Sequence, residues 1–450
     1  MELSPVVDDD EDVRSALAWL ADVSGDPAAF DLRLRAAQLA YARYTAEPAN
    51  LGGDSSLRAL GPDVVAAFLA QSKSMLDDRR SYDIALSSRC IPWVKQLGVN
   101  IAQLAKVPGA RERARRMLED RATEPDGPML ELVMAGNYAA DGADVALVPE
   151  QVGRAKTPDL HLTFEYHPDP VAIEFKRLRE GAYEADERQQ QRRIFRKAEE
   201  IIHRERLSLH VDVNYSRELK DVPDGYLAGW LQRFLTSPLI TLRGYPWHDE
   251  FGSGEIRPAN VDAVLEDIRD TSLYFGTKLA RLLSGAPVRE NGYQLAAGLL
   301  PDERDPRYFK RFRYGSVITW QCTAPAAIER KTRHVKSKLI EASQQVATQE
   351  VGVIHLAMDM ELECEASDLR RERNKQVIRE FKVENVVAAL YVHYLVPRIS
   401  ELNTWIIDET VDRFGAGVDA VPSSMIFPGS AELGNDVPAW RQSIPLPPRR

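Results

Sequence analysis

The sequence predicts a mixed α/β fold of the α+β type, in which a helical region precedes a mixed core and a further α/β region follows it. Three observations support this. The chain up to about Ala122 carries apolar residues at helical spacing. The stretch from Gly127 to Asn214 has the predicted order helix, strand, strand, strand, helix, strand. Beyond Asn214, helical and strand patterns alternate to about residue 420.

The length of 450 residues fits two or three domains. We expect a helical region at 1–122, a core at 123–220 and an α/β region at 221–420 that extends the core or packs on it. The tail at 421–450 is rich in proline, which predicts irregular or disordered structure.

Helices are predicted in the first region because apolar residues recur every three to four positions. We expect these helices to form a bundle that covers one side of the core. Their predicted ranges are Val13–Val23, Phe30–Tyr44, Val64–Met75, Ile91–Ala105 and Ala110–Leu118.

The core is predicted from six consecutive segments whose apolar spacing changes between the helical period and the strand period of two. In chain order these segments are Gly127–Gly142 (helix), Asp144–Pro149, Asp159–Phe164 and Val171–Lys176 (strands), Ala185–Arg206 (helix) and Leu207–Asn214 (strand).

The second and third of these strands are expected to form an antiparallel hairpin, because the connector Tyr166–Pro170 is rich in turn-forming residues. Pairing Asp159 with Glu174 joins the two polar faces, and a slip of one residue would break the match on both faces. In that register the apolar residues also face one another: Leu160 with Ile173, and Leu162 with Val171.

This hairpin places two carboxylates, Asp159 and Glu174, on the same face as the amine of Lys176. Hard divalent cations prefer oxygen ligands, and the carbonyl of Phe175 could add a third oxygen. A metal-bound water with a lowered pKa can attack a phosphodiester, while Lys176 orients or deprotonates that water or stabilises the developing charge. The alternative is a plain salt bridge on a sheet face.

The residues Pro158-Asp159 and Glu174-Phe175-Lys176 resemble the motif of the PD-(D/E)XK nuclease superfamily, which has restriction-endonuclease-like folds. Other acid-x-Lys tripeptides occur in the chain, but only here does Pro-Asp open an alternating strand before one. The resemblance covers about Gly127–Asn214. It implies an αβββαβ core and Mg²⁺ (or Mn²⁺) as the cofactor.

The resemblance also implies a metal-binding glutamate on the first core helix, a position that Glu131 occupies. The alternative interpretation of Glu131 is an ordinary carboxylate near a helix N-terminus, which the helix dipole favours.

Nucleic-acid binding is predicted for basic residues that follow the motif. Arg177 comes directly after Lys176, and Arg188, Arg192 and Arg196 share one helix face at i, i+4 and i+8. Such a row can bind phosphates. The alternative is a solvated helix face, since charge runs are common on surfaces.

The global balance is acidic, with a net charge of −10 and a pI of about 5.5. Dedicated duplex-binding proteins are usually basic, so we expect weak binding alone, a delivered substrate or a partner protein. Three distant cysteines without zinc spacing and the lack of an apolar span or signal favour the cytoplasm and exclude a membrane protein. We interpret Gly252-Ser253-Gly254 as a flexible loop, because no apolar strand leads into it.

Two classes of function remain. The first is a metal-dependent nuclease that hydrolyses phosphodiester bonds in nucleic acid, and we expect DNA rather than RNA as its substrate. A homodimer would suit it, because cutting both strands of a duplex needs two sites. The second is a catalytically inactive, nuclease-fold interaction or scaffold protein. The intact set of Asp159, Glu174 and Lys176 favours the nuclease.

Overall fold

The computed structural model of the chain describes residues 10–47, 57–77, 84–149, 157–164, 167–237, 244–268, 277–286, 292–303, 309–346, 351–362, 364–381, 387–399, 405–415, 421, 425–428 and 438–441. Within these residues the strands form two mixed sheets, one of six strands and one of five. The mixed α/β class predicted from the sequence is confirmed.

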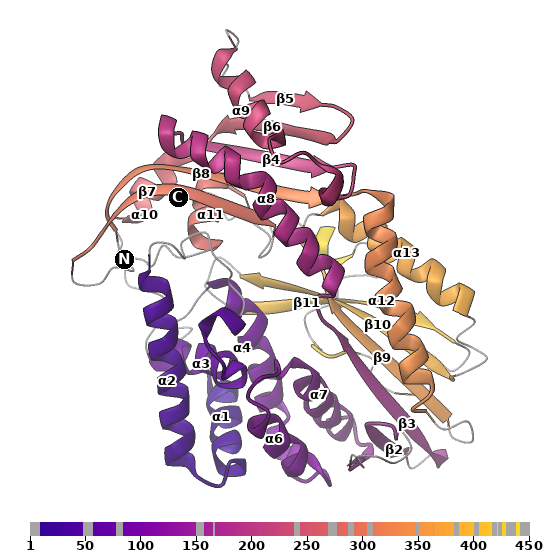
Figure 1. Ribbon diagram of the computed structural model, residues 1–450. Coiled ribbons are helices and arrows are strands. Elements are labelled where there is room, and N and C mark those ends of the chain that lie inside the picture. Colours follow the sequence, from indigo (N-terminus) through magenta and orange to yellow (C-terminus); the bar gives the residue numbers. More distant parts are fainter. Residues whose placement is uncertain are drawn as a thin grey trace, which may run out of the picture.

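The first region is helical, as predicted. Its helices pack side by side next to the six-stranded sheet (Figure 1). They are α1 (Glu11–Val23), α2 (Pro27–Ala46), α3 (Val64–Asp77), α4 (Ile84–Val99), α5 (Ile101–Leu104) and α6 (Ala110–Glu119). Asp10 and Asp26 cap α1 and α2 by accepting hydrogen bonds from backbone N–H groups of the first turn.

The six-stranded sheet has the order β1-β2-β3-β9-β10-β11. The first three strands are antiparallel, β3, β9 and β10 run parallel, and β11 is antiparallel to β10. The strands are β1 (Asp144–Leu147), β2 (Leu160–Phe164), β3 (His167–Leu178), β9 (Val351–Asp359), β10 (Ala389–Ile399) and β11 (Trp405–Phe414).

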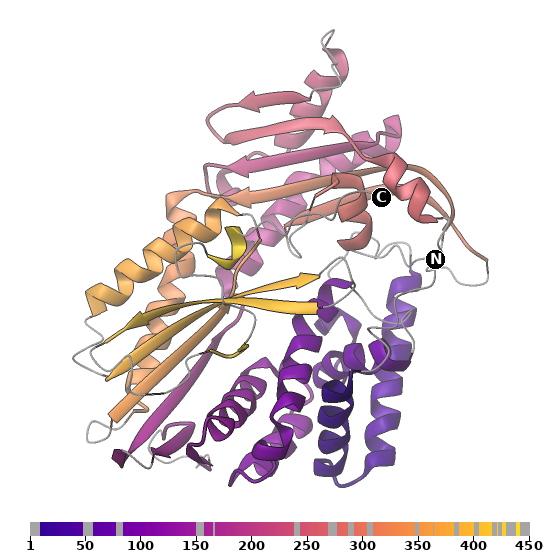
Figure 2. The ribbon, with the colours of Figure 1, turned by 180° about the vertical axis from the view of Figure 1, so that it is seen from behind.

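Helices cover both faces of this sheet (Figure 2). Odd-numbered residues of β3, such as Ile173 and Phe175, pack in one apolar core with α4 and with α7 (Asp126–Ala140). Even-numbered residues, such as Ala172 and Leu178, pack in another core with α12 (Pro325–Ser343) and α13 (Glu365–Phe381). The alternation of side chains along β3 therefore divides its residues between two different environments.

The predicted register of the hairpin is confirmed at the apolar positions. Leu160 pairs with Ile173, and Leu162 pairs with Val171. Asp159 lies just before β2, and its N–H donates to the carbonyl of Ile173 (3.0 Å). The two strands thus hold Asp159 beside the Glu174-Phe175 peptide.

The prediction for the fourth core strand is wrong in one respect: the strand forms, but it lies in the other sheet. β4 (Leu209–Tyr215) follows α8 (Ala182–Glu205) as expected, but it lies in the five-stranded sheet, and β3 pairs with β9 instead. The physical reason is the path of the chain. β4 and β9 both follow a helix and both are central, largely buried strands, so their local patterns do not decide which of them pairs with β3.

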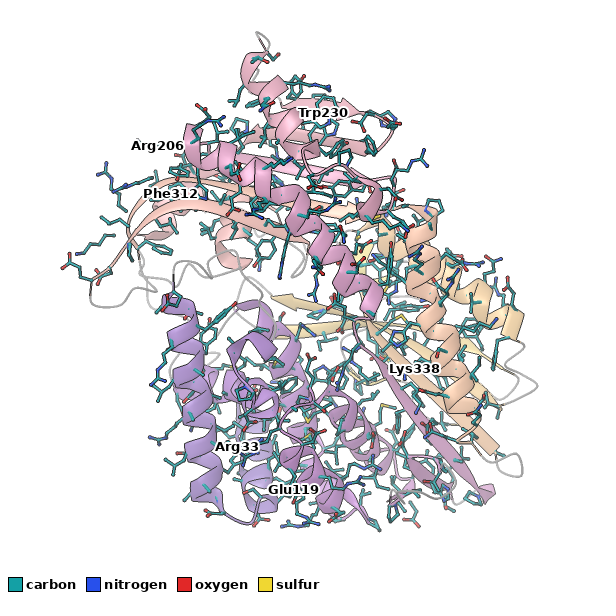
Figure 3. All side chains as sticks on the ribbon, viewed as in Figure 1. Arg33, Glu119, Arg206, Trp230, Phe312 and Lys338 are labelled. Atoms are coloured by element: carbon teal, nitrogen blue, oxygen red, sulfur yellow. The ribbon has the colours of Figure 1, made fainter. Side chains whose placement is uncertain are left out.

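The five-stranded sheet has the order β5-β6-β4-β8-β7, and α8 leads into it. α8 and α9 (Tyr226–Thr236) cover one face, and α10 (Val261–Ile268) and α11 (Thr277–Ser284) contribute to the core on the other. Trp230 of α9 (Figure 3) stacks on Trp247, with ring centroids 5.4 Å apart. The remaining strands are β5 (Tyr245–His248), β6 (Gly252–Pro258), β7 (Tyr293–Pro301) and β8 (Phe309–Cys322).

The interpretation of Gly252-Ser253-Gly254 as a loop is wrong, because these residues open strand β6. A Cβ at Gly254 would lie 2.3 Å from the Trp247 ring and 2.5 Å from the Asp212 carbonyl oxygen. The glycine therefore permits the close packing of three neighbouring strands.

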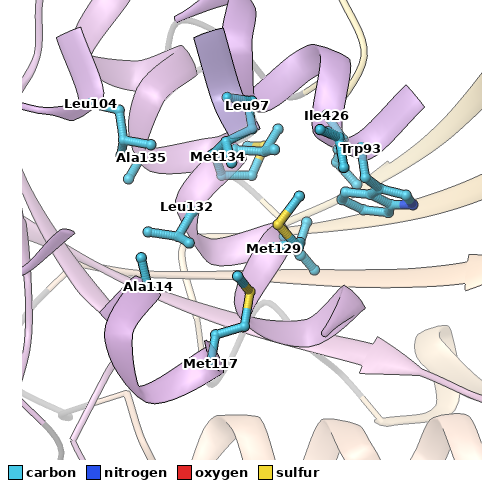
Figure 4. Close-up of a cluster of buried hydrophobic side chains, with 14 of the residues drawn as sticks. Trp93, Leu97, Leu104, Ala114, Met117, Met129, Leu132, Met134, Ala135 and Ile426 are labelled. Carbon is cyan, nitrogen blue, oxygen red and sulfur yellow. The ribbon is translucent and has the colours of Figure 1, made fainter. Parts of the chain in front are cut away.

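The described part of the proline-rich tail is largely irregular, as one of the two expectations held, but it is packed against the body rather than disordered. Ile426 is fully buried beside α7, next to Trp93 and Met134 (Figure 4). Trp440 is also fully buried, and its indole N–H donates to Asp368 of α13 (2.7 Å). Among the described helices, none is both long and apolar enough to cross a membrane.

We expect Gly254→Ala to lower the free energy of unfolding by about 1–3 kcal/mol, because the added methyl group overpacks the sheet against Trp247. The control is Gly229→Ala in α9, where an added Cβ meets nothing within 4 Å. That change should be neutral or stabilise by up to ~1 kcal/mol. Urea denaturation of both variants measures the difference, and equal stability would contradict the packing argument.

Candidate active site

Glu174 is the most deeply buried acid of the predicted site. It lies on β3 with its side chain fully inaccessible to solvent. Lys176, two residues further along the same face, donates a hydrogen bond to Oε1 of Glu174. The Lys176 amine also donates to Oε1 of Gln345 (2.8 Å), and the Gln345 amide donates to the carbonyl of Thr157 (3.4 Å). Glu174 and Lys176 are therefore held together on the face that α12 covers.

Asp159 is fixed through both its backbone and its side chain. Its carbonyl accepts from the N–H of Val148 (2.9 Å), and its Oδ2 accepts from the N–H of Phe175 (2.8 Å). The carboxylate thereby satisfies a β3 backbone donor that lies beyond the first residue of β2. This anchors the aspartate next to Glu174.

The electrostatics of the site favour a neutral Glu174. Burial, together with the negative charges of Asp159 and Glu131, raises the pKa of Glu174 to about 9 against the opposing effect of Lys176. Oε2 of Glu174 has no hydrogen-bond partner among the described residues, although it is buried. An unsatisfied buried oxygen that is reluctant to ionise is suited to a ligand that brings positive charge.

Glu131 lies on α7, as predicted, but its carboxylate is ion-paired with Arg113 of α6. The Arg113 guanidinium also lies 4.0 Å from Oδ1 of Asp159 and donates to the carbonyl of Val148 (3.2 Å). Arg113 was not among the site residues predicted from the sequence. The signal was present, because Arg113 falls on the apolar face of α6 together with Ala110, Ala114 and Met117.

Within the part of the chain that the structure describes, no three His, Cys, Asp or Glu side chains gather in an arrangement that holds a metal ion. The expected set of Asp159, Glu174 and Glu131 is thus not assembled, because Arg113 engages Glu131. The remaining donors are Asp159, Glu174 and the Phe175 carbonyl. Such a set still fits Mg²⁺, which commonly takes one or two protein carboxylates and keeps several waters.

Arg177 does not lie with the site residues. It is an odd-numbered residue of β3, so it points to the opposite face, where its side chain is 5% exposed. Its guanidinium forms ion pairs with Asp126 (3.1 Å) and Asp359 (2.5 Å). The predicted contact with nucleic acid is therefore replaced by a buried structural network, which the parity of the strand explains.

The other predicted basic residues lie along α8. Arg188 is ion-paired with Glu180 and 23% exposed, whereas Arg192 and Arg196 are exposed. The opposite side of the helix is buried and contains Ile194 and Ala198. The structure thus places the basic row on the outer side of the helix that follows β3.

No protein-family model matches this chain, and no curated protein or solved structure matches it either. The assignment of a function depends on the geometry described above.

We expect Glu174→Gln to stabilise the metal-free protein at alkaline pH. Folding raises the pKa of Glu174 to about 9, so the folded state retains a proton that the unfolded chain releases above its ordinary pKa, and stability falls as pH rises toward 9. Glutamine mimics the protonated form and removes this loss, which is on the order of 4 kcal/mol between pH 5 and pH 8. Thermal melts in EDTA at the two pH values measure it. A difference between the variants that does not change with pH would contradict the assignment of a neutral Glu174.

Proposed function

We propose that the chain is a metal-dependent phosphodiesterase, a nuclease of the PD-(D/E)XK type. The observation that carries the proposal is the environment of Glu174. A fully buried carboxyl group with one unsatisfied oxygen lies between Asp159 and Lys176. A plain surface salt bridge would not place its acid in such a position, because burial without full pairing is costly.

The order of the elements supports the same proposal. The path α7, β1, β2, β3, α12, β9 consists of a helix, three antiparallel strands, a helix and a strand parallel to the third. This is the αβββαβ order of the restriction-endonuclease-like core, and we propose that core here. The five-stranded sheet and its helices are then an insertion between β3 and α12.

Asp159, Glu174 and the Phe175 carbonyl would hold Mg²⁺ or Mn²⁺. The bound ion would supply a water of lowered pKa and offset charge on the phosphate oxygens. Asp159 is already oriented by the Phe175 N–H, and Glu174 must lose its proton before it can act as a ligand. Lys176, positioned by Gln345, provides a positive charge for the attacking water or the developing anion.

Nucleic acid, with DNA favoured over RNA, is the proposed substrate. Arg192 and Arg196 are exposed on the outer side of α8, and we propose that they contact phosphates. The net charge of −10 favours a delivered substrate or a partner protein, and a homodimer would supply the two sites that a duplex needs.

A second candidate, an inactive scaffold of the same fold, is favoured by one observation. Arg113 already neutralises Glu131, and no three acidic groups are assembled among the described residues. Calorimetry with Mn²⁺ on the wild type and on Asp159→Asn separates the two candidates. Heat of binding that is lost in the variant supports the nuclease, and identical titrations support the scaffold.

We expect Asp159→Ala and Lys176→Ala each to reduce Mg²⁺-dependent cleavage by roughly a thousandfold or more, because both act on the reacting phosphate and its metal. A panel of single-stranded, double-stranded, branched and RNA substrates provides the assay. Lys106→Ala, at an exposed position outside the site, is the control and should retain activity. Undiminished cleavage by the Asp159 and Lys176 variants would assign the activity to a contaminant or another site.

We expect the double variant Arg192→Glu/Arg196→Glu to raise KM for nucleic acid about tenfold or more with little change in kcat, because it removes phosphate contacts that are remote from the reaction. The dependence of KM on salt should become shallower. Arg43→Glu on α2, also exposed, serves as the control for a change in surface charge. If both proteins respond equally, the basic row has no role in binding.

A further inference from the structure

The guanidinium of Arg113 lies inside the acidic site rather than at the protein surface. Its side chain is 7% exposed, and that of its partner Glu131 is 13% exposed. The same guanidinium lies 4.0 Å from Oδ1 of Asp159. Arg113 therefore lies close to both Glu131 and Asp159.

The helix that carries Arg113 is fixed in this orientation. Gly109 precedes α6 with a φ of 85°, and a Cβ at this position would lie 2.8 Å from the carbonyl oxygen of Leu147 at the end of β1. The Arg113 guanidinium donates to the carbonyl of Val148, the next residue (3.2 Å). The turn and the hydrogen bond together hold the cation against the edge of the sheet that carries the site.

Two cations already lie among the acids of the site. Arg113 is ion-paired with Glu131 and lies 4.0 Å from Oδ1 of Asp159, and Lys176 donates a hydrogen bond to Glu174. A divalent cation at these acids would compete with the two side chains for the same carboxylates.

We propose that Arg113 is a resident counter-ion that competes with the divalent cation, occupying Glu131 and thereby setting a low affinity of the site for metal. The inference rests on the proposed function and adds a residue that the motif does not contain. With a divalent cation present, Glu131 would leave the guanidinium of Arg113 and would be available to the ion or to its waters. Glu131 would therefore pair with Arg113 in the metal-free protein and bind the metal ion only when that ion is present.

The physical basis is repulsion between like charges at short range. A divalent ion bound to Oδ1 of Asp159 would lie within a few ångströms of a buried guanidinium, where screening by solvent is weak. Loss of that charge, together with release of Glu131, should tighten binding by about tenfold or more. Arg113→Lys keeps the positive charge in the site, so the low affinity of the site for the divalent cation should largely remain.

The experiment is titration calorimetry with Mn²⁺ on the full-length wild type, Arg113→Gln and Arg113→Lys at pH 8, with circular dichroism to verify folding. We expect Arg113→Gln to bind Mn²⁺ at least tenfold more tightly than the wild type, and Arg113→Lys to remain within about threefold of it. Equal or weaker binding by a folded Arg113→Gln protein would overturn the inference, because an arginine that merely orients the ligands gives that result.

A further variant keeps the test decisive if Arg113→Gln does not fold. Glu131→Gln removes the partner of Arg113 and leaves its positive charge in the site, so Mn²⁺ should bind several-fold more weakly than to the wild type. Unchanged or tighter binding would overturn the inference. If neither the wild type nor any variant binds Mn²⁺, the proposed function fails as well. If the wild type binds and Arg113→Gln binds equally, only the role of Arg113 fails.

Discussion

The structure depends on the burial of one ionisable side chain, Glu174, in the middle of a covered sheet. β3 is paired on both edges, antiparallel to β2 and parallel to β9, and helices cover both of its faces. The side chain of Glu174 is therefore inaccessible to solvent. A carboxyl group in this position stays protonated unless a cation compensates its charge, since transfer of an unpaired anion to such an environment is very unfavourable. Three neighbours surround this group. The Phe175 N–H anchors Asp159, Lys176 donates a hydrogen bond to Glu174, and Arg113 lies next to Asp159.

The same strand also stabilises the opposite side of the sheet. Lys176 faces α12 and belongs to the site, whereas Arg177 faces the N-terminal helices and pairs with Asp126 of α7 and Asp359 of β9. The two basic residues differ in function only because adjacent side chains of a strand point to opposite faces. The buried pairs of Arg177 tie the helical region to the parallel strands, so the helices that carry Arg113 and Glu131 keep a fixed position relative to β3.

Local features were predictable from the sequence, and features that depend on distant segments were not. The hairpin register followed from matching two alternating patterns separated by a short turn, and the helices followed from their apolar spacing. The partner of β3 did not, because both β4 and β9 follow a helix and both are apolar strands, and only the path of the chain decides between them. Arg113 was not predicted because its contacts depend on tertiary packing. Glu131 lies 18 residues away in the sequence, and Asp159 lies on the sheet against which α6 packs. Similarly, no local sequence pattern predicts that Ile426 packs beside α7.

Two positive groups already occupy the places that a divalent cation would take, and this bears on how the site would work. One is the proton of Glu174, and the other is the guanidinium beside Glu131. Both are held by burial, since in bulk water the acid would ionise and the ion pair would contribute little. The site is therefore stable without metal, and the free energy of metal binding must include the removal of a proton and of an ion pair. A substrate phosphate adds negative charge at the same place, and it lowers the electrostatic cost of bringing the divalent ion next to Arg113 and Lys176. Affinity for the metal and affinity for the substrate are then coupled through the same charges, and by linkage each strengthens the other to the same degree.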